Sequence, residues 1–76
     1  MASSLDLINL GYIIAKYEAL FVSRVELFPL SDTDIWKLQR VGDDDYTVTH
    51  EGTPKELIST LISAIQKALP GEVILL

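Results

Sequence analysis

The chain has 76 residues, a net charge of −5 and no cysteine, and 49% of its residues are hydrophobic. A chain of this length accommodates one domain, so we expect residues 1–76 to form a single domain. Its core is marginal, because only about 60% of the unfolded surface is buried at this size. The absence of cysteine excludes disulfides and thiolate metal sites. Stability must then come from regular packing, another kind of metal site or oligomerisation.

The six basic residues are scattered along an acidic chain. Nucleic acids and anionic membranes are both bound through clustered lysine and arginine, so we expect neither as a partner. Asp6, Lys16 and Glu18 interrupt the first apolar stretch, which is therefore unlike a signal peptide or a membrane-spanning helix. We expect a soluble, cytoplasmic protein whose acidity serves solubility or attracts a basic partner.

Residues 4–22 carry apolar side chains at helical spacing and predict the first helix. The main stripe consists of Leu7, Leu10, Ile14, Tyr17 and Phe21. Leu5, Ile8 and Tyr12 widen this stripe until most of the circumference is apolar. Such a helix needs cover on more than one side, and one small sheet cannot supply it.

Three segments with a period near two predict strands at residues 24–30, 35–41 and 46–51. Acidic and small residues separate them, as is typical of turns. The residues that we expect to share faces within the strands are Val25 with Leu27, Trp36 with Leu38 and Arg40, and Tyr46 with Val48 and His50. The short connection at 42–45 makes the second and third strands the clearest hairpin.

Thr53, Pro54 and Glu56 predict the start of a second helix. A threonine N-cap, a proline at the first helical position and a glutamate three residues after the cap form a capping box. A single apolar stripe follows, made of Leu57, Ile58, Leu61, Ile62, Ile65, Ala68 and Leu69. Pro70 and Gly71 are expected to end this helix.

These elements predict an α+β fold with the order α-β-β-β-α, in which two helices pack on a small antiparallel sheet. The apolar residues 72–76 predict a possible short C-terminal strand. The order resembles that of double-stranded-RNA-binding domains, whose last helix begins with a lysine-rich segment that grips phosphate. Here Thr53-Pro54-Lys55-Glu56 offers one lysine beside a glutamate, so RNA binding is not expected. The order of elements alone carries no function.

The residue types that carry chemistry form no catalytic motif. Asp43, Asp44 and Asp45 cannot all aim at one ion from a tight connection, so we interpret them as a solvated turn or as an acidic docking patch for basic residues. His50 is the only histidine and is interpreted as a structural strand residue. The glycines are isolated, which excludes a P-loop or a dinucleotide motif. We expect no enzymatic activity, no metal and no cofactor.

The surplus of apolar surface predicts a small acidic protein-interaction module that acts as an adaptor, chaperone or regulatory subunit, as a homodimer. The candidate interface consists of Leu5, Ile8, Tyr12, Trp36, Tyr46, Val73, Ile74, Leu75 and Leu76. Trp36 and Tyr46 are first interpreted as a packed aromatic pair across the hairpin, and as interface anchors if that face is open.

The alternative hypothesis is a small-molecule-binding domain with a pocket between the first helix and the sheet. The residues that could line this pocket are Gly11, Tyr12, Tyr17 and Trp36. At this length a pocket competes with the core for volume.

Overall fold

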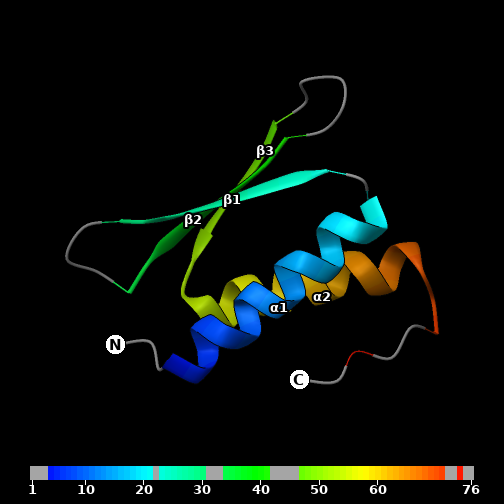
Figure 1. The fold of residues 1–76 in the computed structure, drawn as a ribbon, viewed down its shortest axis with the longest axis horizontal. Helices are drawn as coiled ribbons and strands as arrows, with labels where there is room; N and C mark the ends of the chain where they lie inside the picture. The colour runs from blue at the N-terminus through cyan, green and yellow to red at the C-terminus, as the bar shows by residue number, and fades with distance from the viewer. Residues whose placement is uncertain (1–3, 22, 31–33, 42–46, 72–73, 75–76) are drawn as a thin grey trace.

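The structure, a computed structural model, describes residues 4–21, 23–30, 34–41, 47–71 and 74. Helix α1 (Ser4–Phe21) precedes the strands in the sequence, and helix α2 (Pro54–Ala68) follows them. In space they lie side by side on one face of the sheet and run in the same direction (Figure 1). The predicted α-β-β-β-α order, with two helices on a small sheet, is confirmed.

The sheet consists of β1 (Arg24–Pro29), β2 (Trp36–Val41) and β3 (Thr47–Gly52), joined antiparallel in the order β1-β2-β3. Leu27 pairs with Leu38, which pairs with His50. Directly paired residues share a face, so these three positions belong to the inner face, which meets the helices. Each strand begins and ends within one residue of its predicted bounds.

The inner and outer faces of the sheet differ in polarity, as the alternation predicts. Val25, Leu27 and Trp36 are partly buried against the core, and Leu38 is fully buried. The outer-face positions are Arg24, Glu26, Phe28, Lys37, Gln39, Val41, Thr49 and Glu51. The sheet therefore packs part of its inner face against the core and turns a mostly polar face to solvent.

The core lies mainly between the two helices. Its eight buried side chains are Leu10, Ile13, Tyr17, Leu38, Leu57, Ile58, Leu61 and Ile65. Seven of these belong to α1 or α2, and Leu38 is the contribution of the sheet. Packing against α2 thus takes up one side of α1 and leaves another side that the described residues do not cover.

The start of α2 is the predicted capping box. The Glu56 N–H donates to Oγ1 of Thr53 at 3.3 Å, and the Thr53 N–H donates to Oε1 of Glu56 at 3.1 Å. Pro54 follows the cap at the start of the helix, where its missing N–H costs no hydrogen bond. Both partners of the box are satisfied, which fixes where α2 begins.

The end of α2 also follows the sequence. The helix ends at Ala68, and the Leu69 N–H still donates to the Ile65 carbonyl oxygen at 2.8 Å. Gly71 has a φ of +93°, a conformation that favours glycine. Of the possible strand at 72–76, only Ile74 is described; it is half-buried, packs against the core and is not in a strand.

Candidate protein-interaction surface

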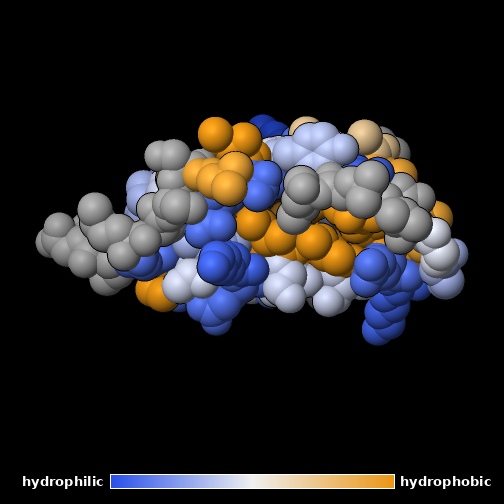
Figure 2. Space-filling model, turned by 90° about the horizontal axis from the view of Figure 1, so that it is seen from below, coloured by the Kyte–Doolittle hydropathy of each residue, from blue (hydrophilic) through white to orange (hydrophobic). Residues whose placement is uncertain are grey.

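The side of α1 that points away from α2 carries large exposed hydrophobic side chains. Leu5 is 65% exposed, Ile8 67% and Tyr12 55%, which makes them the most exposed large hydrophobic residues described. Their spacing of three and four residues places them on one helix face. Figure 2 views the molecule from the helical side and shows hydrophobic atoms at the surface there.

This side of α1 continues as a row of small residues. We define the outer face of α1 as the exposed residues Leu5, Ile8, Gly11, Tyr12, Ala15 and Ala19. None of the six is charged. A Cβ added at Gly11 would meet no atom within 4 Å, so the backbone of this face is open to close approach. The outer face is therefore a continuous uncharged strip on an acidic protein.

Sequence reasoning identified the large residues of this strip but not the part played by Ala15 and Ala19. The spacing of these residues in the sequence indicates that they belong to the same face. Leu5, Tyr12 and Ala19 are seven residues apart, and Ile8 and Ala15 follow the first two by three. This is the a/d spacing of a heptad repeat, the pattern along which helices pair. This heptad spacing is hard to recognise in the sequence, because α1 is apolar over most of its circumference and the buried stripe runs beside the outer face.

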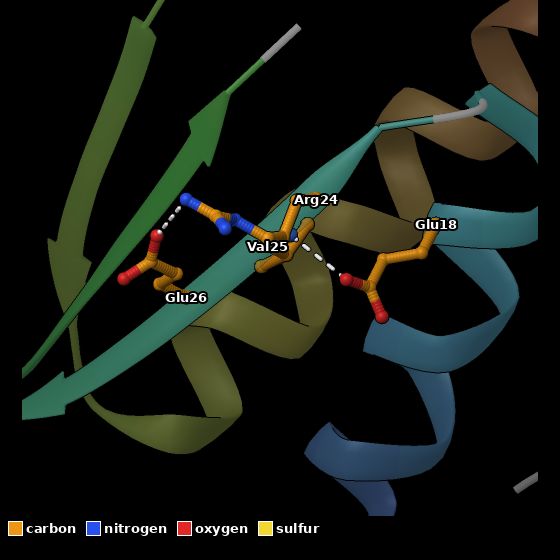
Figure 3. Close-up of polar contacts among 4 residues, drawn as sticks. All are labelled: Glu18, Arg24, Val25 and Glu26. Atoms are coloured by element: carbon orange, nitrogen blue, oxygen red, sulfur yellow. Dashed lines mark hydrogen bonds and ion pairs between the residues drawn. The ribbon is translucent and has the colours of Figure 1, made fainter.

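The outer face points outward because the opposite side of α1 is anchored. Leu10, Ile13 and Tyr17 are buried in the core. The Val25 N–H donates to Oε2 of Glu18 at 2.9 Å, which ties the end of α1 to the first strand (Figure 3). A carboxylate acceptor makes this a charge-assisted hydrogen bond. Core packing and this bond together fix the rotation of α1.

A second contact between α1 and the sheet is aromatic. The Tyr17 and Phe21 rings stack with centroids 4.4 Å apart. The Arg40 guanidinium lies 5.6 Å from the Tyr17 centroid and 5.7 Å from the Phe21 centroid. Arg40 belongs to the inner face of β2, so the cation lies between the sheet and the helix. A guanidinium at this distance is attracted by the ring quadrupole.

The two edges of the sheet are protected differently. Alternate residues of an antiparallel strand bond to the neighbour, and since the Val25 N–H bonds to Glu18, the outward positions of β1 are Val25, Leu27 and Pro29. The Val25 N–H is already bonded to Glu18, and Pro29 has no N–H to donate. Following the same alternation across the sheet, Thr49 and Glu51 direct their N–H groups to the open side of β3. The β3 edge is thus the less protected one.

The outer surface next to the β1 edge is polar. Nη2 of Arg24 forms an ion pair with Oε1 of Glu26 at 2.8 Å (Figure 3). The Arg24 side chain is 72% exposed, so this pair contributes little to stability.

The structure brings together only part of the predicted interface. Leu5, Ile8 and Tyr12 share one exposed face. Trp36 and Ile74 are half-buried and pack against the core instead. The other predicted interface and docking residues, Asp43, Asp44, Asp45, Tyr46, Val73, Leu75 and Leu76, lie outside the described residues.

The residues of the alternative pocket are divided between two sides of the helical layer. Gly11 and Tyr12 are exposed on the outer face of α1. Tyr17 is buried in the core, and Trp36 belongs to the inner face of the sheet. The four residues do not gather around one space, and no described feature favours this hypothesis.

Within the described ranges, no group of three histidine, cysteine or acidic residues could hold a metal ion. His50 is exposed on β3. In the same part of the chain, neither helix has the length and apolar character needed to cross a membrane. No family model, curated protein or solved structure matches the chain. Its function has to be inferred from its own residues.

Proposed function

We propose that this protein is a small acidic protein-interaction module that acts as a homodimer, without catalytic activity of its own. Two copies meet at the outer face of α1. The observation that supports this is the exposure of Leu5, Ile8 and Tyr12 on one uncharged helix face. A row of exposed large hydrophobic residues marks an interaction site more often than a free surface.

The energetics favour association. Full burial of one large hydrophobic side chain contributes about 1.5–3 kcal/mol, and each copy brings three such chains that are more than half exposed. A domain this small gains stability when a partner covers that surface. An interface built on one 18-residue helix is smaller than the roughly 800 Å² per partner of a standard complex. We therefore expect a dimer that dissociates in the micromolar range.

Charge supports a contact at this particular face. Two copies with a net charge of −5 repel each other, so they approach most easily where neither presents a charge. Raising the ionic strength from about 0.01 M to about 0.15 M shortens the Debye length from about 30 Å to about 8 Å. Homodimerisation should therefore strengthen with salt, whereas docking of a basic partner on an acidic surface should weaken.

Sedimentation equilibrium with two matched variants tests the proposal. Ile8→Glu places a charge in the outer face of α1, whereas Phe28→Glu places the same charge on the outer face of the sheet, where Phe28 is 41% exposed. Both replace an exposed apolar side chain, so both should keep the fold, which circular dichroism verifies. We expect Ile8→Glu to be monomeric and Phe28→Glu to dimerise like the unmodified protein.

Two results would contradict the proposal. One is an unmodified protein that stays monomeric up to millimolar concentration at both the low and the high ionic strength. The other is a dimer that Ile8→Glu leaves intact, since copies would then meet elsewhere.

A further inference from the structure

We infer that the two copies of α1 pair antiparallel, so that each large side chain in the overlap packs on an alanine of the partner. This inference rests on the proposed homodimer and specifies its geometry. The heptad spacing of Leu5, Ile8, Tyr12, Ala15 and Ala19 forms a seam that a second helix can occupy. A second copy of this chain offers the same seam.

The side chains of the seam become smaller from the start of α1 to its end. Its large residues lie in the first half of α1, and its second half carries only Ala15 and Ala19. In a parallel pair, each seam residue would meet the same residue of the partner. Three layers of large side chains would then be followed by two layers of alanine. Such helices would be held apart at one end and leave voids at the other, which packing disfavours. Reversing one helix sets a large residue against an alanine at the four layers where the two seams overlap, and Leu5 lies beyond this overlap.

The register follows from the a/d layers. In an antiparallel pair each a position faces a d position, which places Ile8 opposite the partner's Ala19 and Tyr12 opposite the partner's Ala15. The two-fold axis then passes between positions 13 and 14. Ile8 and Ala19 are eleven residues apart, about 17 Å along the helix, so the two orientations are easily distinguished.

The charged residues beside the seam are compatible with this register. Lys16 and Glu18 flank the seam on its two sides. In the antiparallel register they lie level with the partner's Gly11 and the partner's Asn9. No like charges face each other, and the oppositely directed helix dipoles are complementary. Glu18 keeps its hydrogen bond to Val25, since that bond lies on the side of α1 that faces the sheet.

Cysteine crosslinking tests the orientation, because the chain has no cysteine of its own. Ile8→Cys and Ala19→Cys are oxidised separately and as a mixture, and products are identified by mass. The antiparallel pair gives a crosslink only in the mixture, whereas a parallel pair gives one with each variant alone. Tyr12→Cys mixed with Ala15→Cys repeats the test at the second layer. Ser63→Cys, exposed on α2, measures crosslinking by random collision.

The outcomes separate this inference from the proposed function. A dimer in which Ile8→Cys links to itself overturns the antiparallel pairing and leaves the homodimer standing. A dimer in which Thr49→Cys crosslinks, and neither mixture does, means that copies meet at the β3 edge, and this also overturns the pairing. A protein that sediments as a monomer removes the proposed function first and the pairing with it.

Exchanging large and small residues gives an independent test. Ala19→Leu sets two bulky residues against each other in the antiparallel pair and should weaken dimerisation about tenfold. Adding Ile8→Ala to Ala19→Leu restores one large and one small residue per layer and should recover most of that loss. If Ala19→Leu instead strengthens the dimer, as a parallel Leu-to-Leu contact would, the inference is wrong.

Discussion

Oε2 of Glu18 in α1 accepts the backbone N–H of Val25 in β1 at 2.9 Å. This bond joins a helix side chain to the first inner-face residue of an edge strand. It occupies an edge donor and holds the end of α1 against the sheet. Because rotation of α1 decides which of its sides faces outward, this bond helps to keep Leu5, Ile8 and Tyr12 exposed.

Glu18→Ala should therefore destabilise the fold by about 1–2 kcal/mol, because it leaves the partly buried Val25 N–H without its charged acceptor. Glu26→Ala is the matched control, since it removes an equal charge whose partner Arg24 is largely exposed. We expect it to cost less than about 1 kcal/mol. Urea unfolding followed by Trp36 fluorescence measures both. Equal losses would mean that the hydrogen bond to Val25 contributes nothing.

The sequence predicted local features better than relationships between elements. Thr53 and Glu56 specify the start of α2 because both partners of the capping box lie within one turn. Alternation predicted the faces of β1 and β2 because neighbours in a strand point to opposite sides. The sequence assigned Leu5, Ile8 and Tyr12 to an interface, but it did not show that Ala15 and Ala19 continue their face, because α1 is apolar over most of its circumference. The bond from Glu18 to Val25 was also out of reach, since it depends on how the chain turns between them.

Arg40 provides the second contact between α1 and the sheet, and its replacement should lower the free energy of unfolding. Its guanidinium lies over the Tyr17 and Phe21 rings, and its Nε is buried without a hydrogen-bond partner among the described residues. Arg40→Ala removes the cation–π attraction and the packing of the aliphatic stem, at a cost of about 1–2 kcal/mol.

Arg24→Ala is the control for this experiment, because Arg24 is 72% exposed and pairs only at the surface. It should cost less than about 0.5 kcal/mol in the same urea titration. Arg40→Lys keeps the charge but not the planar group, so its loss should be intermediate. If Arg40→Ala is no more destabilising than Arg24→Ala, the ring contacts do not stabilise the fold.

The capping box gives the stability a dependence on acid pH. The backbone N–H and then the hydroxyl of Thr53 donate to the Glu56 carboxylate, and both lower its pKa. A group whose pKa is lower in the folded state stabilises the fold fully above its unfolded pKa, and this contribution is lost as the pH falls through the folded pKa. Acidification should therefore weaken the start of α2.

Glu56→Gln keeps an acceptor at this position but does not titrate, so its unfolding free energy should fall less steeply below about pH 4.3. Urea unfolding across an acid pH series compares it with the unmodified protein. Thr53→Ala should cost about 1 kcal/mol at neutral pH, whereas Thr53→Ser should cost much less. Identical pH profiles for Glu56→Gln and the unmodified protein would contradict the role of this carboxylate.

The two glycines at Gly11 and Gly52 should respond in opposite directions to the same substitution. A Cβ at Gly52 would lie 3.1 Å from Cβ of Glu56, so Gly52→Ala crowds the capping box and should destabilise the fold by about 1 kcal/mol or more. At Gly11 a Cβ meets nothing within 4 Å, and alanine favours a helix interior over glycine by about 1 kcal/mol. Gly11→Ala should therefore stabilise the fold, as measured by thermal unfolding at protein concentrations low enough to exclude dimerisation. A destabilised Gly11→Ala would mean that the outer face of α1 is covered within the same chain, and the proposed interface would lose its main support.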